Sequence, residues 1–168
     1  MATMRLTVVD EPSDRPEWIR ETLRLLAERT ERGRTRLLER VALASDAELV
    51  AGSDDDWGVG QVATHLLIVE RGMALIALRL ASGQPPGPTG QPRPAAAGVS
   101  REGVATAAEK AAATLRRLGE EFPAEPDTVA VARSPYYGGM NCFGWLLMLP
   151  YHYEAHLEAL DRGRKSAL

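Results

Sequence analysis

The residues whose types and spacing could do chemistry are the three histidines of this 168-residue chain. His152 and His156 are four residues apart, so in a helix their side chains would lie one above the other on the same face. Their stripe also carries Trp145 and Leu149, which indicates that it faces a core. Two neutral imidazoles buried there need hydrogen bonds or a metal ion.

The third histidine, His65, interrupts a second apolar stripe, which continues through Val69 and Ile76. Taken alone, each histidine is compatible with a hydrogen-bonded core residue. Together they place three nitrogen ligands on the inward-facing lines of two helices. Such a set is typical of a transition-metal site with one coordination position open, and the sequence therefore predicts His65, His152 and His156 as metal ligands. Zinc suits them best, and nickel, iron and manganese are compatible with them.

The elements that must position the histidines are four helices, which together predict an all-α four-helix bundle in a single domain, 1–168. Apolar stripes at helical spacing predict helices over about 17–41, 57–81, 100–122 and 141–163. Residues 1–15 are predicted to be irregular, with an isolated extended piece at 6–9. Pro150 lies inside the last helix and is expected to kink it.

The segment 84–98 is rich in proline and glycine and is longer than a turn between antiparallel helices requires. In a four-helix bundle such a connection predicts a crossover, with the second and third helices parallel. A flexible lid over the site is the functional alternative.

Several local features have two interpretations. Thr30 and Gly33 in the first helix predict close helix packing, or alternatively room for a cavity beside the metal. The acidic run 53–56 is expected to cap the second helix, with a carboxylate ligand cluster as the alternative. Ser13 or Asp14 is expected to cap the first helix, Ser100 the third and Asn141 the fourth.

No general base is evident beside the histidines. The glutamates nearest to them in sequence lie off the histidine stripes and are expected to be surface charges; they are Glu70, Glu154 and Glu158. Gln61, one turn before His65 on the same face, is the better candidate for a residue that supports a ligand.

Four further residues could contribute to the site. Tyr136, Tyr137 and Tyr153 are candidates for its mouth or, equally, for packing. Cys142 is expected to be a packed thiol, since ten residues separate it from the nearest histidine of its helix. The catalytic residues therefore remain unassigned.

Composition narrows the function classes. The net charge is −3, and acidic and basic residues are interspersed along the chain. The sequence therefore indicates no cluster of aromatic and basic residues that would bind nucleic acid. The single cysteine excludes an intrachain disulfide, as in a reducing compartment. The first residues lack the pattern of a signal peptide, and no apolar segment is expected to reach the length of about 20 residues that a membrane span needs. The prediction is a cytoplasmic protein that binds neither nucleic acid nor membrane.

Two segments resemble the DinB-like (damage-inducible) superfamily of metal-binding four-helix bundles. They are Trp-Gly-Val-Gly-Gln-Val-Ala-Thr-His at 57–65 and His-Tyr-Glu-Ala-His at 152–156. The resemblance implies an up-down-down-up order of helices and a divalent metal held by His65, His152 and His156. The residues after the histidine pair, 157–159, depart from the small residue and Gly-Gln of many relatives, so no particular enzyme subgroup is assigned.

The superfamily includes bacillithiol- and mycothiol-dependent S-transferases and mycothiol-dependent maleylpyruvate isomerases. The expectation is therefore a metal-dependent enzyme that uses a low-molecular-weight thiol cosubstrate for S-transfer or isomerisation of a small electrophilic substrate. A metal-dependent hydrolase that uses bound hydroxide is the enzymatic alternative. A metal- or ligand-binding module without turnover is the third hypothesis, and a homodimer is left open.

Overall fold

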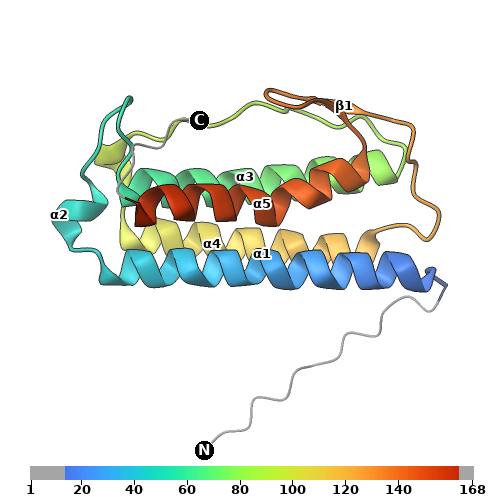
Figure 1. Ribbon diagram of the computed structural model, residues 1–168, viewed down its shortest axis with the longest axis horizontal. Helices are drawn as coiled ribbons and strands as arrows, with labels where there is room; N and C mark the ends of the chain where they lie inside the picture. Colours follow the sequence, from blue (N-terminus) through green and yellow to red (C-terminus); the bar gives the residue numbers. More distant parts are fainter. Residues whose placement is uncertain (1–13, 163–168) are drawn as a thin grey trace, which may run out of the picture.

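The computed structural model describes residues 14–162, and four long helices dominate it (Figure 1). These helices are α1 (Glu17–Leu43), α3 (Val59–Ala81), α4 (Arg101–Glu121) and α5 (Cys142–Asp161). The shorter elements are α2 (Asp46–Leu49), a 3-10 turn η1 (Ala96–Gly98), and an antiparallel hairpin of β1 (Ala132–Ser134) and β2 (Gly138–Met140). The predicted extended piece at 6–9 and the predicted cap Ser13 lie outside the described residues.

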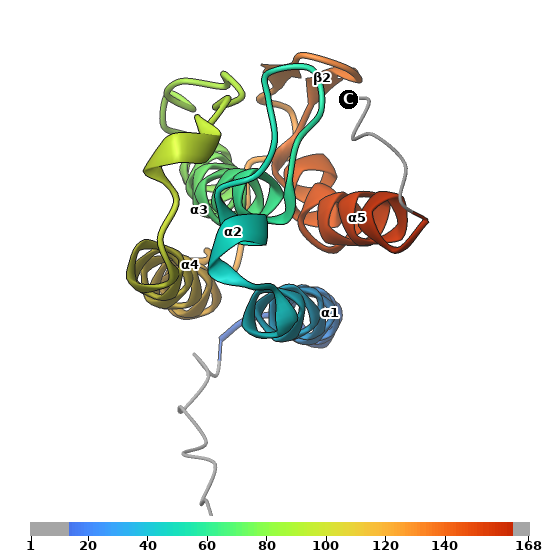
Figure 2. The same ribbon diagram turned by 90° about the vertical axis from the view of Figure 1, so that its left-hand side faces the viewer.

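The order of the helices is up-down-down-up, as predicted. In Figure 1, α1 and α5 run in one direction, and α3 and α4 run in the other. The segment 82–100 returns along the length of the bundle to connect the parallel pair, so the predicted crossover is confirmed. The end-on view in Figure 2 shows the four helices side by side around one interior.

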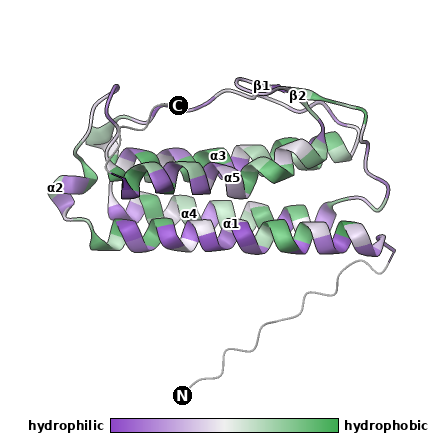
Figure 3. Cartoon of the chain, in the orientation of Figure 1, coloured by the Kyte–Doolittle hydropathy of each residue, from purple (hydrophilic) through white to green (hydrophobic). Residues whose placement is uncertain are grey.

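The interior consists of two apolar clusters at opposite ends of the bundle. Three buried residues of α1 lie between the two clusters, namely Thr30, Gly33 and Arg34. The apolar residues that repeat at helical spacing along α1 and α4 are buried as well, among them Leu26, Leu37, Leu115 and Leu118. Figure 3 shows hydrophilic and hydrophobic positions alternating along α1, as a helix with one buried face requires.

Helix α3 is the central element, since it packs against both α4 and α5 and also contacts α1. Its length and composition would suffice to cross a membrane, so the expectation that no segment reaches that length is wrong. Burial inside the bundle explains its apolar character, because 72% of its most apolar window is covered by the other elements.

The caps of two helices are as predicted. The Ser100 hydroxyl accepts from the amide of Gly103 at 3.0 Å, and the Asn141 side chain accepts from the amide of Gly144 at 3.1 Å. In contrast, Asp14 does not cap α1, whose cap position is taken by Pro16 without a side-chain hydrogen bond.

The acidic run does not cap α3, which is a correction to the sequence prediction. Its residues form a separate turn, in which the Ser53 hydroxyl accepts from the amide of Asp56 at 3.1 Å. The helix begins later, at Val59, after the cap residue Gly58, whose amide donates to the Gln61 side chain at 3.1 Å. The cap is thus supplied from inside the helix, by the glutamine.

Pro150 lies buried in the middle of α5, two residues before His152. Because proline has no amide proton, the carbonyl of Leu146 loses its helical partner there. Figure 1 shows that α5 changes direction near its middle, as expected for a proline inside a helix.

Candidate metal centre

The three histidines meet in the interior. His65 projects from α3, and His152 and His156 project from successive turns of α5. One ligand nitrogen from each ring lies within 4.8 Å of the other two, and Nε2 of His65 is 3.0 Å from Nε2 of His152. All three side chains are buried, and none is more than 7% exposed. The prediction that they converge is confirmed.

The ring of His65 is oriented by a backbone carbonyl. Its Nδ1 lies 2.8 Å from the carbonyl oxygen of Pro92, in the crossover segment. Because a carbonyl oxygen only accepts hydrogen bonds, Nδ1 carries the proton, and the lone pair of Nε2 points toward the α5 histidines. The indole of Trp57 packs edge-on against the same imidazole, with the ring centroids 4.9 Å apart.

Gln61 was expected to support a metal ligand directly, and the structure corrects this. Its amide nitrogen donates to the carbonyl oxygens of Ser53 at 3.2 Å and Pro94 at 3.1 Å. Gln61 therefore holds the crossover segment two residues beyond Pro92. Its influence on His65 is indirect, through the position of that loop.

Burial keeps the imidazoles neutral. Desolvation, together with the neighbouring His156 and His65, lowers the pKa of His152 from 6.5 to about 3. Desolvation and His65 lower the pKa of His156 from 6.5 to about 4. Burial also lowers the pKa of His65, against the opposing effect of its bond to Pro92. Near neutral pH all three rings therefore offer the uncharged form that a metal requires.

The donor set fits a divalent transition metal. Three neutral imidazole nitrogens at about 2.0–2.1 Å from one tetrahedral ion lie about 3.3 Å from each other. Here one pair of ligand nitrogens is 3.0 Å apart, and no pair is more than 4.8 Å apart, so the observed separations bracket that value. Among the described residues no carboxylate or thiolate joins the group, so the protein would supply three nitrogen ligands and leave a fourth position open.

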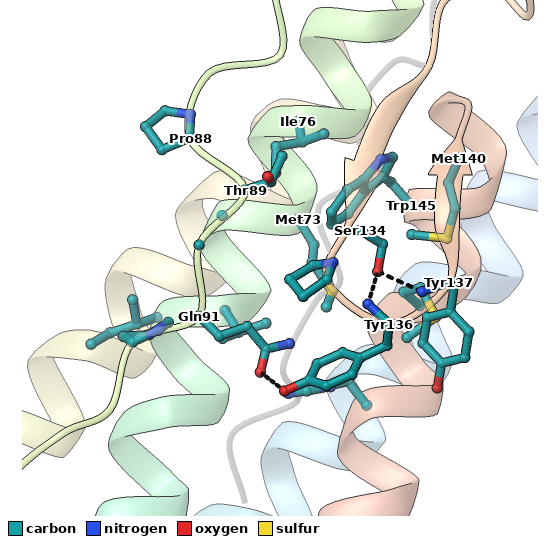
Figure 4. A pocket seen from close by; sticks show the side chains of 18 of the residues that line it. Met73, Ile76, Pro88, Thr89, Gln91, Ser134, Tyr136, Tyr137, Met140 and Trp145 are labelled. Carbon is teal, nitrogen blue, oxygen red and sulfur yellow. Dashed lines mark hydrogen bonds between the residues drawn. The ribbon is translucent and has the colours of Figure 1, made fainter. Parts of the chain in front are cut away.

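A cavity of about 120 Å³ lies beside the histidines, and His152 forms part of its wall. Helices α3 and α5 form one side, and the crossover segment and the β1–β2 connection form the other (Figure 4). Tyr136 and Tyr137 line it, as one of the two interpretations of these residues predicted. The Tyr136 hydroxyl donates to the Gln91 side chain at 3.2 Å, which joins the two loops.

Tyr153 does not line this cavity and instead belongs to a buried polar network that the sequence did not predict. Its hydroxyl donates to Oε2 of Glu70 at 2.6 Å, and Oε1 of Glu70 pairs with the guanidinium of Arg34. Glu70 is 2% exposed, so its prediction as a surface charge is wrong. The network connects α1, α3 and α5.

The remaining glutamates are surface charges, as predicted. Glu154 pairs with Arg29 of α1 at 2.8 Å, and Glu158 pairs with Arg162 one turn later at 3.0 Å. For Gly33 the packing interpretation holds, since a Cβ there would lie 2.6 Å from Cβ of Tyr153. Neither Gly33 nor Thr30 lines the cavity beside His152.

Cys142 is a packed thiol, as expected. It is fully buried, and its Sγ lies 3.4 Å from the carbonyl oxygen of Asp127. Burial raises the pKa of this thiol, which is the opposite of what a reactive cysteine needs.

Comparison with known protein families gives a match over residues 29–160 to the model of the DinB superfamily. The chain belongs to the DinB superfamily. Among solved structures, this DinB protein is similar to TT2238, described as a four-helix bundle protein, with a TM-score of 0.64 and 26% sequence identity. The alignment covers 83% of this chain and 98% of TT2238. No curated protein gives a significant match.

The family match spans both helices that carry the histidines and the crossover segment between α3 and α4. The resemblance inferred from the segments at 57–65 and 152–156 is therefore confirmed at the level of superfamily and fold. A DinB bundle with three converging imidazoles is compatible with metal binding.

Proposed function

We propose that this DinB protein binds one divalent metal ion through His65, His152 and His156 and uses it in an enzymatic reaction of a small electrophilic substrate. The observation that carries the proposal is the convergence of three buried imidazole nitrogens within 4.8 Å, with one of the three rings in a cavity wall. A bound ion of this kind supplies a Lewis acid, which lowers the pKa of a coordinated thiol or water.

Contacts within the chain hold the three imidazoles in the form that binds a metal. The backbone of Pro92 fixes the tautomer of His65, and burial keeps the α5 histidines unprotonated. Three neutral ligands leave the full charge of a divalent ion uncompensated, which favours an anionic fourth ligand such as a thiolate. We therefore propose a low-molecular-weight thiol as cosubstrate and S-transfer or thiol-assisted isomerisation as the reaction, with zinc as the preferred metal.

Elemental analysis tests the metal site. The purified protein is expected to contain about one transition-metal ion per chain, as a three-histidine set predicts. His152→Ala removes one ligand and is expected to lose most of this metal. Leu147→Ala, on the exposed side of the same helix, is the matched control and should keep it. Equal metal content in His152→Ala and the wild type would show that the ligand set is wrong.

The reaction is tested with monochlorobimane as electrophile and with bacillithiol or mycothiol as thiol. Metal-loaded protein should accelerate bimane conjugation with one of them, and His152→Ala should not. If metal-loaded protein turns over neither thiol, S-transfer is refuted, and activity on ester substrates then separates a hydrolase from a binding module. The absence of a carboxylate from the donor group, among the described residues, favours the binding module in that event.

A further inference from the structure

Only one tautomer of His65 leaves Nε2 free for a metal, and a carbonyl in the crossover segment selects that tautomer. We infer that Gln61 is a positioning residue for this selection. Its buried side-chain amide holds the crossover segment where the carbonyl of Pro92 accepts the Nδ1 proton of His65. The effect on metal binding rests on the proposed function, whereas the effect on the tautomer needs no metal. Nothing in the proposed function requires Gln61.

The position of the proton on His65 decides whether this residue is a ligand. A neutral imidazole carries one proton, on either Nδ1 or Nε2, and only the other nitrogen binds a metal. Here Nδ1 lies 2.8 Å from the carbonyl oxygen of Pro92, and Nε2 lies 3.0 Å from Nε2 of His152. Without the carbonyl, the Nε2–H tautomer would be favoured, because Nε2 of His152 can accept its proton. The two histidines would then bind each other instead of the ion.

The stretch that carries Pro92 has no regular structure to hold it in place. Residues 84–95 contain no helix or strand. Tyr136, which is 51% exposed, donates to the side chain of Gln91 (Figure 4). Gln61, which is 1% exposed, donates to the backbone carbonyl of Pro94. Because the second contact is buried and reaches the backbone itself, it fixes the stretch more firmly than the first.

Neighbouring backbone groups fix the orientation of the Gln61 amide. Its Nε2 donates to the carbonyls of Ser53 at 3.2 Å and Pro94 at 3.1 Å, and its Oε1 accepts from the amide of Gly58 at 3.1 Å. Gly52 packs so closely against this amide that a Cβ there would be 2.1 Å from Oε1. Both donors are in use, and a flipped amide would point its oxygen at two carbonyl oxygens. The amide therefore has one orientation.

The anchor and the histidine belong to the same helix. Gln61 and His65 are one turn apart on α3, about 6 Å along its axis. Their partners Pro94 and Pro92 are two residues apart, so α3 holds the loop at two closely spaced points. Without Gln61 the loop would keep the exposed contact of Tyr136 and the bond to the imidazole. The loop backbone would gain conformational freedom, which weakens the bond to Nδ1.

Gln61 also caps α3, and the two roles use different atoms. The cap uses Oε1, and the contacts with the loops use Nε2. Gln61→Glu keeps an oxygen for the amide of Gly58, as the glutamate of a capping box does, but its ionised side chain has no donor. Gln61→Met has a similar length and neither group. An effect common to both variants therefore results from the lost donors and not from the lost cap.

The tautomer is measured in the metal-free protein. Long-range proton–nitrogen correlation spectra of isotope-labelled protein distinguish the protonated nitrogen of each ring, and His65→Gln assigns the signals of His65. Wild-type His65 should carry its proton on Nδ1. In both Gln61 variants the ratio of the Nδ1–H to the Nε2–H form should fall about fivefold to tenfold, in keeping with the weakening of one hydrogen bond. Leu118→Ala, which destabilises the bundle in the other apolar cluster, is the control and should keep the ratio.

Zinc affinity is measured on the same preparations by competition with a chelator. Both Gln61 variants should bind zinc about tenfold more weakly than the wild type, as is typical when a residue that orients a ligand from outside the ligand set is changed. Leu118→Ala should keep the affinity of the wild type. Gly52→Ala is a third variant, in an exposed turn, which displaces the Gln61 amide without removing it. It should lower the tautomer ratio in the same direction, also where the Gln61 variants do not fold.

Two results would overturn the inference. The first is wild-type His65 with its proton on Nε2, which requires no variant. The second is a tautomer ratio or a zinc affinity that is the same in the folded variants as in the wild type. A tautomer shift in a protein that binds no metal would refute the proposed function and leave the role of Gln61 in place. Zinc binding with an unchanged tautomer ratio would refute the role of Gln61 and leave the proposed function in place.

Discussion

The hydroxyl of Tyr153 donates a hydrogen bond of 2.6 Å to Glu70, and both side chains are almost completely buried. Tyr153 follows His152 on α5, and Glu70 lies on α3, which carries His65. The bond therefore joins the two helices that supply the metal ligands. Arg34 of α1 completes the network by pairing with the other carboxylate oxygen.

Tyr153→Phe tests the strength of this connection. The variant keeps the ring and leaves one oxygen of a buried carboxylate without its donor, which is expected to lower the free energy of unfolding by about 1–3 kcal/mol. Urea denaturation of both proteins measures the difference. Tyr137→Phe, at a half-exposed tyrosine, is the control and should change stability by about 0.5 kcal/mol or less. Equal stability of Tyr153→Phe and Tyr137→Phe would contradict a structural role for the bond.

Removal of the carboxylate should have a larger effect. In Glu70→Ala the Arg34 guanidinium, whose side chain is 9% exposed, loses its buried partner. Breaking a buried pair in this way costs about 3–5 kcal/mol. The double variant Arg34→Met/Glu70→Leu removes both charges and should recover much of the loss. A double variant that is no more stable than Glu70→Ala would show that packing, not the unpaired charge, dominates the effect.

Gly33 should tolerate no side chain, because Tyr153 occupies the space. The Cβ of Gly33→Ala would lie 2.6 Å from Cβ of Tyr153, so the helices must move apart, at a cost of about 1–3 kcal/mol. Gly119→Ala, in a helix with open surroundings, should instead stabilise the protein by about 0.5–1 kcal/mol. Thermal denaturation of the two variants is therefore expected to give shifts of opposite sign. A shift of the same sign in both would contradict the close packing.

The metal-free protein should lose stability as the pH falls from about 6.5. The folded-state pKa values of His152 and His156, about 3 and about 4, lie below the value of 6.5 for an unfolded chain. Between these limits the unfolded state binds more protons, so stability decreases as the pH decreases. Burial raises the pKa of Glu70, which acts in the opposite direction above pH 4.5.

Comparison with His152→Gln isolates the histidine contribution. The variant lacks one of the groups that titrate, so its stability should fall less steeply between pH 6.5 and 5 than that of the wild type. Urea denaturation at several pH values, in the presence of a chelator, measures both slopes. Parallel curves would show that His152 is not held neutral in the folded state.

The periodicity of the sequence was sufficient to predict the bundle and the meeting of the histidines. The stripes of α1 and α4 have one buried face each, so their spacing identifies the core residues directly. The connection at 84–98 is too long for a tight turn, and this length predicted that α3 and α4 run parallel.

Helical periodicity did not identify the buried residues of α3 correctly. Glu70 lies off the stripe of His65, which would place it at the surface of a helix with one buried face. Helix α3, however, is covered by α1, α4 and α5, so residues on nearly every side of it are buried. How many neighbours surround a helix is a property of the assembled bundle, and periodicity does not contain it.

Contacts made by irregular segments were equally inaccessible to sequence analysis. The partner of His65 is a backbone carbonyl in a segment rich in proline and glycine, and the predicted partner Gln61 instead holds that segment. Neither fact follows from residue types. The cavity was missed for the same reason, since two of its walls are loops.

The carbonyl of Pro92 has a consequence for how this region tolerates change. Every amino acid has a main-chain carbonyl, so a substitution at position 92 does not by itself remove the acceptor of the His65 proton. An inserted or deleted residue between Gly83 and Pro94 would shift that oxygen along the bundle and leave the imidazole without its support. The identity of the loop residues is thus freer to vary than their number. Sequence divergence in this loop therefore says little about whether the three-histidine site is intact.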